Sequence, residues 1–208
     1  MASTNSTAAA AAPAGFQFPR EYYFPPFFTR QTNLNTHHAQ LVKWSSLVLS
    51  YCQHHRIFKL SLSPTGSSTA TAAVDGSSGS TEDIFHNKKL NRRLALADIR
   101  EVVDFMRKDG RAEYVGGAEG VAGAGGDVVW VYWRTPEEWA ALVEGWVDET
   151  AQKGTVLTLY ELTEGEATRG TDFHGLDQDL LQKALNVLVK RGKAQIFGQE
   201  DSQGVKFF

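Results

Sequence analysis

Apolar residues recur at helical spacing in four stretches of the chain. These stretches are residues 36–56, residues 98–108, a segment that begins at Thr135 and continues through Val147, and residues 177–191. In each stretch the apolar positions fall three or four residues apart, which places them on one face of a helix. The pattern therefore predicts four amphipathic helices, each with one face turned toward a core.

Shorter stretches between these helices have the alternation typical of strands. Strands are expected at residues 57–62, 111–115 and 127–133, and in at least the first half of residues 155–162. Residues 193–198 and 204–208 are expected to form a closing hairpin, and residues 85–90 a short helix. The prediction is therefore an α+β fold.

The helix ends carry clear local signals. Thr135, Pro136 and Glu138 predict an N-terminal cap, because threonine can accept a bond from the third helical amide while the glutamate bonds back. Gly110 and Gly192 follow the second and fourth helices, where a glycine commonly ends a helix in a left-handed conformation. These signals fix where helices begin and end.

The chain contains an internal repeat with an offset of 82 residues. MRKDGRAEYV at 106–115 lies over LVKRGKAQIF at 188–197, and both halves share the order helix, strand, helical segment, helix and hairpin. This order is typical of winged helices, a variant of the helix-turn-helix. We expect two tandem winged-helix domains, at 16–134 and 135–208, that abut at a short junction. Two unrelated α+β domains are the alternative.

Three segments have low complexity and are expected to add little to the folded domains. Residues 1–15 are rich in Ala, Ser and Thr and are expected to be a disordered tail. Residues 63–83 form a Ser/Thr/Gly/Ala-rich insert that is expected to be flexible. Residues 116–126 form a glycine-rich loop, interpreted as the wing between two strands.

The most unusual stretch of the chain lies near its N-terminus, where FPREYYFPPFFTRQ occupies residues 18–31. Proline fixes φ and lacks an amide donor, so this stretch is expected to be extended or turn-like. We expect Phe16, Phe18 and Tyr22 to fold back on their own domain. The rest of the stretch is interpreted as a partner site, because exposed aromatics mark interfaces. The predicted partner-binding residues are Tyr23, Phe24, Pro25, Pro26, Phe27 and Phe28.

Composition favours an ordinary soluble chain in a reducing compartment. The net charge is −3, and no run of apolar residues is long enough to cross a membrane. The N-terminus has no basic segment of the kind that opens a secretory signal. The single Cys52 cannot form an internal disulfide and lies in an apolar helical stripe. The cytoplasm is therefore the expected location.

Nucleic-acid binding is the alternative function that the predicted fold invites. Residues 136–208 hold seven Lys and Arg against thirteen Asp and Glu, a net charge of −6. Asp177 and Asp179 lie at the end of the helix that would approach the bases, where they would repel phosphate. Only the cluster of Lys88, Lys89, Arg92 and Arg93 favours such a partner.

No residue pattern indicates catalysis, a metal or a cofactor. The pairs His37–His38 and His54–His55 lie at opposite ends of one predicted helix, roughly 25 Å apart at 1.5 Å per residue, too far for one ion. Cys52 is expected to be buried and unreactive. The glycine-rich loop lacks the lysine of a phosphate-binding loop. We therefore expect a protein-binding adaptor and no enzyme.

Several short motifs of the sequence resemble those of the family of small subunits of the ESCRT-II complex. They are YYFPPFFTRQTN, WSSLVLSYC, RTPEEWAALVEGWV, TLYELTEGE, FHGLD and GVKFF, and they occur in the family's order between Phe16 and Phe208. The tail, the insert at 63–83 and the glycine-rich loop depart from the family pattern.

The resemblance implies a function in the sorting of ubiquitinated cargo into multivesicular bodies on endosomes. It implies tandem winged helices and a complex that holds two copies of this chain and one each of two larger winged-helix subunits. It implies that Pro25-Pro26-Phe27-Phe28 inserts into a pocket on each larger subunit. It further implies that the second domain binds the N-terminal helix of an ESCRT-III subunit, with only indirect membrane contact.

Overall fold

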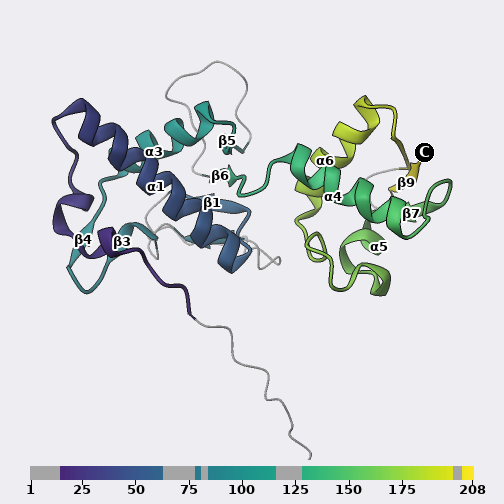
Figure 1. The fold of residues 1–208 in the computed structure, drawn as a ribbon, viewed down its shortest axis with the longest axis horizontal. Coiled ribbons are helices and arrows are strands. Elements are labelled where there is room, and N and C mark those ends of the chain that lie inside the picture. The colour runs from purple at the N-terminus through teal and green to yellow at the C-terminus, as the bar shows by residue number, and fades with distance from the viewer. Residues whose placement is uncertain (1–14, 63–77, 81–83, 116–127, 199–202) are drawn as a thin grey trace, which may run out of the picture.

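The computed structural model describes residues 15–62, 78–80, 84–115, 128–198 and 203–208. The expected tail and the glycine-rich loop lie outside these residues, apart from Gly15. Figure 1 shows two halves side by side, each built from helices and a small sheet. The α+β prediction is confirmed.

The first half begins with two short 3-10 helices, η1 (Arg20–Tyr23) and η2 (Pro25–Phe28). The order then runs through α1 (Leu34–His55), β1 (Lys59–Ser61), β2 (Ser78–Ser80), β3 (His86–Asn87), β4 (Arg92–Arg93), α3 (Leu96–Lys108), β5 (Ala112–Tyr114) and β6 (Val128–Val131). Its four-stranded sheet has the order β2-β1-β6-β5, with β1 and β2 parallel and the other pairs antiparallel.

The second half follows the predicted order of elements. It contains α4 (Pro136–Glu149), β7 (Val156–Thr158), α5 (Leu159–Glu164), η3 (Glu166–Thr168), α6 (Gln178–Lys190), β8 (Ala194–Phe197) and β9 (Gly204–Phe207). The three strands pair antiparallel in the order β7-β9-β8. The expected closing hairpin is present, and the winged-helix assignment stays a prediction.

Two expectations need correction. Residues 86–93 form the β3–β4 hairpin where a short helix was predicted, and this hairpin packs beside the N-terminal segment: the side chain of Asn87 donates to Tyr22 O over 2.7 Å. The strand expected in at least the first half of residues 155–162 is confirmed as Val156–Thr158, and it ends where Thr158 and Glu161 form a second capping box that begins α5. Within the insert predicted to be flexible, Ser78–Ser80 pair with β1, and the rest lies outside the described residues.

The internal repeat is reproduced in backbone geometry. Gly110 and Gly192 end α3 and α6 with φ of +68° and +70°. In both places the amide after the glycine bonds back to the carbonyl five residues earlier, over 2.8 Å from Arg111 to Met106 and 2.9 Å from Lys193 to Leu188. These are Schellman motifs, which require a residue that tolerates positive φ.

The buried apolar residues form two clusters, one for each half, and three aromatics cross between them. Phe58, Trp130 and Tyr132 belong to the first half by sequence but pack in the core of the second. In β6 the alternation sends Val129 and Val131 into the first core. An aromatic side chain buries about 150–250 Å², roughly 4–6 kcal/mol of gross apolar stabilisation each at 25 cal/mol per Å². The halves therefore share a substantial apolar junction, as the short connection predicted.

Cys52 lies within the first core and has no exposed surface. Burial raises the pKa of its thiol to about 12, because the apolar surroundings disfavour the thiolate. The expectation that Cys52 is buried is confirmed, and its low reactivity stays a prediction.

Candidate partner-binding surface

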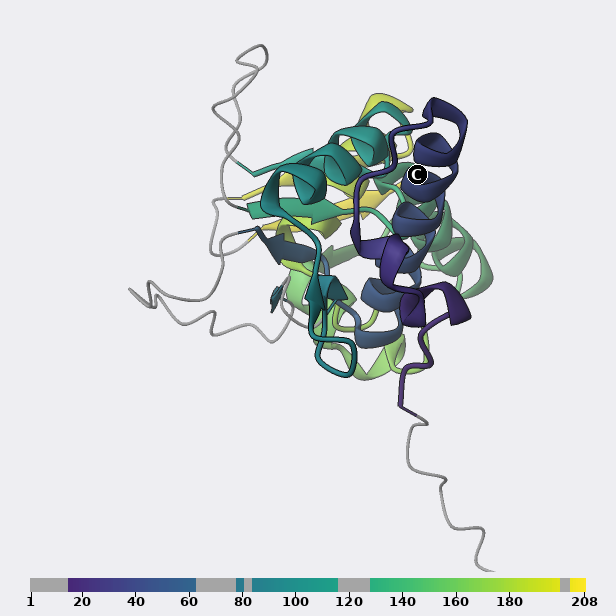
Figure 2. The ribbon, with the colours of Figure 1, turned by 90° about the vertical axis from the view of Figure 1, so that its left-hand side faces the viewer.

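The aromatic N-terminal segment folds as consecutive tight turns along α1. The amides of Tyr22, Phe24, Phe27 and Thr29 each bond to the carbonyl three residues earlier, over 2.9–3.1 Å. Pro25 opens η2, where its fixed φ fits and its missing donor costs nothing. Figure 2 shows the segment, in purple, lying against α1 in the end-on view of the first half. The turn-like prediction is confirmed.

Two of the six predicted partner-binding residues lie inside the chain's own core. Phe27 and Phe28 are 7% and 5% exposed. The Phe27 ring stacks on Trp44 with centroids 4.3 Å apart, and the Phe28 ring meets the same indole edge-on at 5.3 Å. Neither ring is free to anchor a partner in this conformation. The expectation that both project from the domain does not hold, because α1 presents an indole that both can cover.

The other four predicted residues form a continuous exposed edge. Tyr23 and Phe24 are 46% and 61% exposed, and Pro25 and Pro26 are also on the surface. Phe16 and Phe18 are half-buried and Tyr22 is buried, so these three rings do fold back as expected. We call Tyr23, Phe24, Pro25 and Pro26 the docking edge. One side of this short segment is therefore buried against α1, and the docking edge on its other side is exposed to solvent.

Side chains of α1 hold the backbone of this segment in place. Gln40 donates through Nε2 to Phe27 O at 2.7 Å and to Thr29 O at 3.0 Å. Trp44 donates through Nε1 to Phe27 O at 3.1 Å. Hydrogen bonds to buried carbonyls stabilise one backbone conformation, because a lost bond leaves a desolvated acceptor. The turn at η2 is therefore fixed by tertiary contacts.

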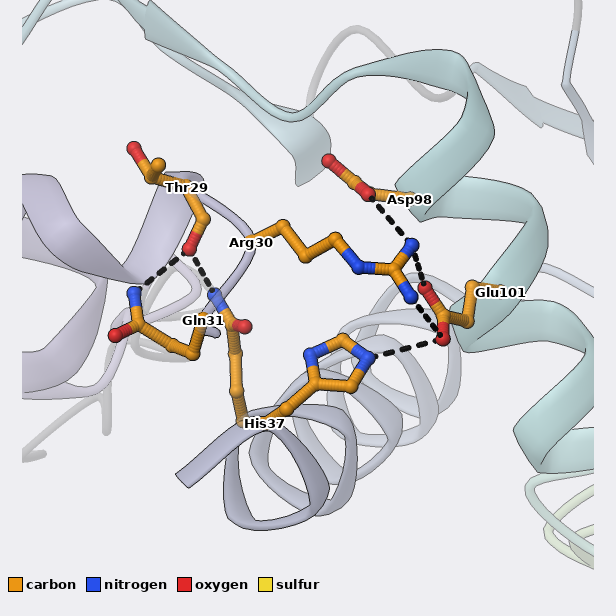
Figure 3. A network of polar contacts seen from close by, with 7 residues as sticks. Thr29, Arg30, Gln31, His37, Asp98 and Glu101 are labelled. Atoms are coloured by element: carbon orange, nitrogen blue, oxygen red, sulfur yellow. Dashed lines mark hydrogen bonds and ion pairs between the residues drawn. The ribbon is translucent and has the colours of Figure 1, made fainter. Parts of the chain in front are cut away.

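A charged network ties the end of the segment to α3, as Figure 3 shows. Arg30 Nη1 lies 2.8 Å from Glu101 Oε2 and 3.9 Å from Asp98 Oδ1. His37 Nε2, on α1, lies 2.9 Å from Glu101 Oε1. Glu101 therefore joins the N-terminal segment, α1 and α3, and limits how far the segment can lift from the domain.

A basic hairpin borders the docking edge. The Lys89 ammonium lies 5.7 Å from the centroid of the Tyr23 ring. Lys88, Arg92 and Arg93 are exposed on the same β3–β4 hairpin, where no carboxylate stands between Lys88 and Arg93. The surface therefore combines exposed aromatic and proline side chains with positive charge.

Sequence reasoning missed Gln40 and Trp44, the two residues that position the segment. Their spacing of four residues on the apolar stripe of α1 places both side chains on one helical face. A glutamine in an otherwise apolar stripe was the available signal. It indicates a buried amide that needs partners, and the carbonyls of Phe27 and Thr29 are those partners.

The second half exposes its own apolar group of residues. Val156 on β7, Phe197 on β8 and Tyr160 on α5 are 54%, 41% and 71% exposed. A Cβ at Gly204, on β9, would lie 3.0 Å from Phe197 Cε2 and 3.4 Å from Val156 Cγ1. The glycine therefore leaves the space that these two side chains occupy on the outer face of the sheet.

The potential metal ligands of the described residues do not gather into a site. No three His, Cys, Asp or Glu side chains among those residues could hold an ion together. His37 pairs with Glu101, while His54 and His55 pack beside Phe16. In the same described part, no helix combines the length and the apolar character needed to cross a membrane.

Comparison with known proteins gives one consistent result. The model of a family described as ESCRT-II complex subunit matches residues 21–177. The vacuolar protein-sorting-associated protein 25 of Xenopus laevis is 37% identical over 194 residues, covering 93% of this chain and 99% of that protein. The Homo sapiens protein of the same name is 39% identical over 193 residues, covering 93% and 98%.

Solved structures agree with these relatives. The crystal structure of subunit VPS25 of the endosomal trafficking complex ESCRT-II matches with a TM-score of 0.75 and 25% identity, covering 91% of this chain and 98% of that one. The crystal structure of the ESCRT-II complex of VPS22, VPS25 and VPS36 matches with a TM-score of 0.72, 25% identity and the same coverage.

Proposed function

Because this chain belongs to the family of ESCRT-II complex subunits, we propose that it is the small, non-enzymatic adaptor subunit of such a complex. In this role it sorts ubiquitinated membrane cargo into multivesicular bodies, from the cytoplasm and with peripheral recruitment to endosomal membranes. The observation that carries the proposal is the docking edge: four apolar residues held outward on a segment whose other side is anchored in the core.

The docking edge binds the two larger subunits, the counterparts of VPS22 and VPS36, with two copies of this chain in each complex. Gln40 and Trp44 hold the carbonyl of Phe27, directly after the edge, so little conformational entropy is lost on binding. Phe24 is the main anchor, because an exposed aromatic that becomes buried in a partner pocket is the usual hot spot. Phe27 and Phe28 do not contact the partner in this proposal; their buried rings fix the shape of the docking edge.

The basic hairpin adds charge to the same contact. Lys89 lies 5.7 Å from the Tyr23 ring of the docking edge, and Lys88 and Arg92 are exposed on the same hairpin, so a pocket with an acidic rim complements this surface better than a neutral one. Rim charges mainly change the association rate and its salt dependence. We therefore assign the hairpin a steering role and the docking edge the affinity.

The second half recruits and activates an ESCRT-III subunit by binding its N-terminal helix. The net charge of −6 over residues 136–208 favours a basic partner. The exposed Val156, Tyr160 and Phe197 provide apolar area that an amphipathic helix can cover. If high salt left binding of an ESCRT-III helix unchanged, charge steering would be excluded and the apolar contact alone would remain.

Nucleic-acid binding is the less favoured alternative. The N-terminal end of α6, which would approach the bases, carries Asp177 and Asp179, and both are paired with Lys59 of the first half at 2.9 Å. The end of α6 that would meet DNA is thus acidic, and its carboxylates already bind Lys59. The hairpin 88–93 remains the candidate for phosphate contacts, and salt-sensitive binding of a DNA duplex that is lost in Arg92→Ala would favour this alternative.

The test is co-purification with both larger subunits, with the stoichiometry measured by light scattering. Phe24→Ala is expected to abolish the complex while the variant stays folded. Tyr160→Ala is the matched control, since it removes an exposed ring from the other half, 71% exposed against 61% for Phe24. Tyr160→Ala should keep the ESCRT-II complex and weaken ESCRT-III helix binding, and Phe24→Ala should do the reverse. A complex that tolerates Phe24→Ala contradicts the proposed docking edge.

A further inference from the structure

The junction between the two halves is organised around one indole ring. Trp130, on β6 of the first half, packs in the core of the second half. The ammonium groups of two lysines lie over its ring, Lys59 from β1 at 4.4 Å and Lys183 from α6 at 5.3 Å from the centroid. One lysine therefore comes from each half and both meet the same ring.

Each of these lysines bonds to carboxylates of the opposite half. Lys59 Nζ lies 2.9 Å from Asp177 Oδ2 and 2.9 Å from Asp179 Oδ2, both at the start of α6. Lys183 Nζ lies 2.7 Å from Glu113 Oε2, on β5. The charge pairs are thus reciprocal, so that a rotation between the halves breaks the bonds of both lysines.

A tyrosine closes the Lys183 side of this network. Tyr132 Oη donates to Glu113 Oε2 over 2.6 Å and accepts from Lys183 Nζ over 2.9 Å. Bonds to a charged partner are short and directional, so they select one geometry more strongly than apolar contact does. The aromatic junction holds the halves together, and the charged bonds select their orientation.

A second contact lies on a different pair of segments. Arg56 follows α1 with φ of +53° and donates through Nη2 to Asp172 O at 3.1 Å and to His174 O at 2.6 Å. Arg134, between β6 and α4, pairs through Nη1 with Asp172 Oδ2 at 2.6 Å. Two arginines that precede the second half, Arg56 and Arg134, therefore bind the loop that carries FHGLD.

We propose that these two sets of contacts lock the halves in one orientation, so that the chain is a rigid spacer between its docking edge and its second half. A single set would leave the halves free to rotate about it, whereas two sets on separate elements, together with the aromatic junction, leave no rotation that keeps every charged bond. In the proposed function, on which this consequence rests, the lock fixes the distance at which the ESCRT-III helix is held from the larger subunits.

The lock is tested on the full chain without any partner, so its failure is distinct from a failure of the docking edge. Spin labels at Asn35→Cys on α1 and Ala141→Cys on α4 report the distance between the halves, and both positions are exposed. The native Cys52 has no exposed surface and stays unlabelled. Double electron–electron resonance is expected to give a single narrow distance. A broad or two-peaked distribution in this otherwise unmodified chain overturns the proposal.

The contacts themselves are tested by Arg56→Ala with Lys183→Glu, which removes one arginine bond pair and repels Glu113. The single narrow distance is expected to be lost while circular dichroism stays unchanged. The matched control is Arg169→Ala with Lys43→Glu, since Arg169 and Lys43 form ion pairs within one half. The control should keep the narrow distance. An equally narrow distance in the test variant overturns the assignment of the lock to these residues.

Discussion

The Phe27 ring lies flat on the Trp44 indole, with centroids 4.3 Å apart and planes 10° apart, while the Trp44 Nε1 donates to the Phe27 carbonyl over 3.1 Å. One residue of α1 therefore holds both the side chain and the backbone of the same phenylalanine. This contact makes the proline–phenylalanine segment part of the core and leaves its outer edge for partners.

The first prediction separates the two sides of this segment. Phe27→Ala is expected to lower the free energy of unfolding by about 3–5 kcal/mol, as for other buried phenylalanines, because it leaves a cavity against Trp44. Phe24→Ala is expected to change it by less than about 0.5 kcal/mol, because the ring is exposed. Urea unfolding followed by tryptophan fluorescence measures both. Equal losses in the two variants would contradict the structure.

The second prediction concerns the buried amide of Gln40. Gln40→Leu removes a donor from the carbonyls of Phe27 and Thr29, so we expect a loss of about 1–3 kcal/mol. Because these bonds hold η2, the amides of Phe27 and Thr29 should exchange with solvent faster. Native-state hydrogen exchange measures this change. Gln53→Leu, at an exposed position of the same helix, should leave the exchange rates unaltered.

The third prediction is a pH dependence at the junction. Burial would raise the pKa of Glu113, but the hydrogen bonds from Lys183 and Tyr132 outweigh it and lower the pKa below the ordinary 4.5. A lowered pKa gives stability that is present above the unfolded value and lost as the pH falls through the folded value. The stability difference between the wild type and Glu113→Gln should therefore be constant at neutral pH and shrink below pH 4.5.

Denaturant unfolding of both proteins between pH 7 and pH 3 provides the measurement for Glu113. The comparison isolates this carboxyl, because all other acidic groups are common to the two proteins. A difference that grew toward acid would mean that the folded state favours the protonated form, in conflict with the Lys183 contact.

The fourth prediction tests the capping box that begins α4, the first helix of the second half. Thr135 Oγ1 accepts from the Glu138 amide at 3.3 Å, and the Glu138 carboxylate accepts from the Thr135 amide at 2.7 Å. Thr135→Ala is expected to cost about 1 kcal/mol, the usual effect of losing an N-cap hydroxyl. Thr135→Ser should retain most of the stability. Thermal unfolding compares the three proteins.

The fifth prediction follows from the burial of Cys52. Because burial raises the pKa of the thiol to about 12, the thiolate is scarce and no reagent reaches the sulfur in the folded chain. A thiol reagent such as Ellman's reagent is expected to react only at the rate of unfolding. Fast reaction under native conditions would show that α1 opens locally around this residue.

Local sequence signals predicted the helices well, for physical reasons that act over a few residues. The predicted ends at Thr135, Gly110 and Gly192 match the structure, because caps and Schellman motifs depend on neighbouring backbone groups. The segment 85–90 was predicted as a helix, but from His86 onward it belongs to the β3–β4 hairpin. Its hairpin is stabilised by partners far away in sequence, as when the Asn87 side chain donates to Tyr22 O, and no local pattern encodes that contact.

The docking edge likewise depends partly on local sequence and partly on contacts that are distant in sequence. The sequence by itself determined that Tyr23 to Phe28 could not form a helix interior or a central strand, and that so many rings needed cover. Only the tertiary structure decided which rings are covered by this chain, because that depends on where α1 places Gln40 and Trp44. The orientation of the two halves is equally nonlocal: Lys59, Glu113 and Lys183 are far apart in sequence and meet only after both sheets have formed.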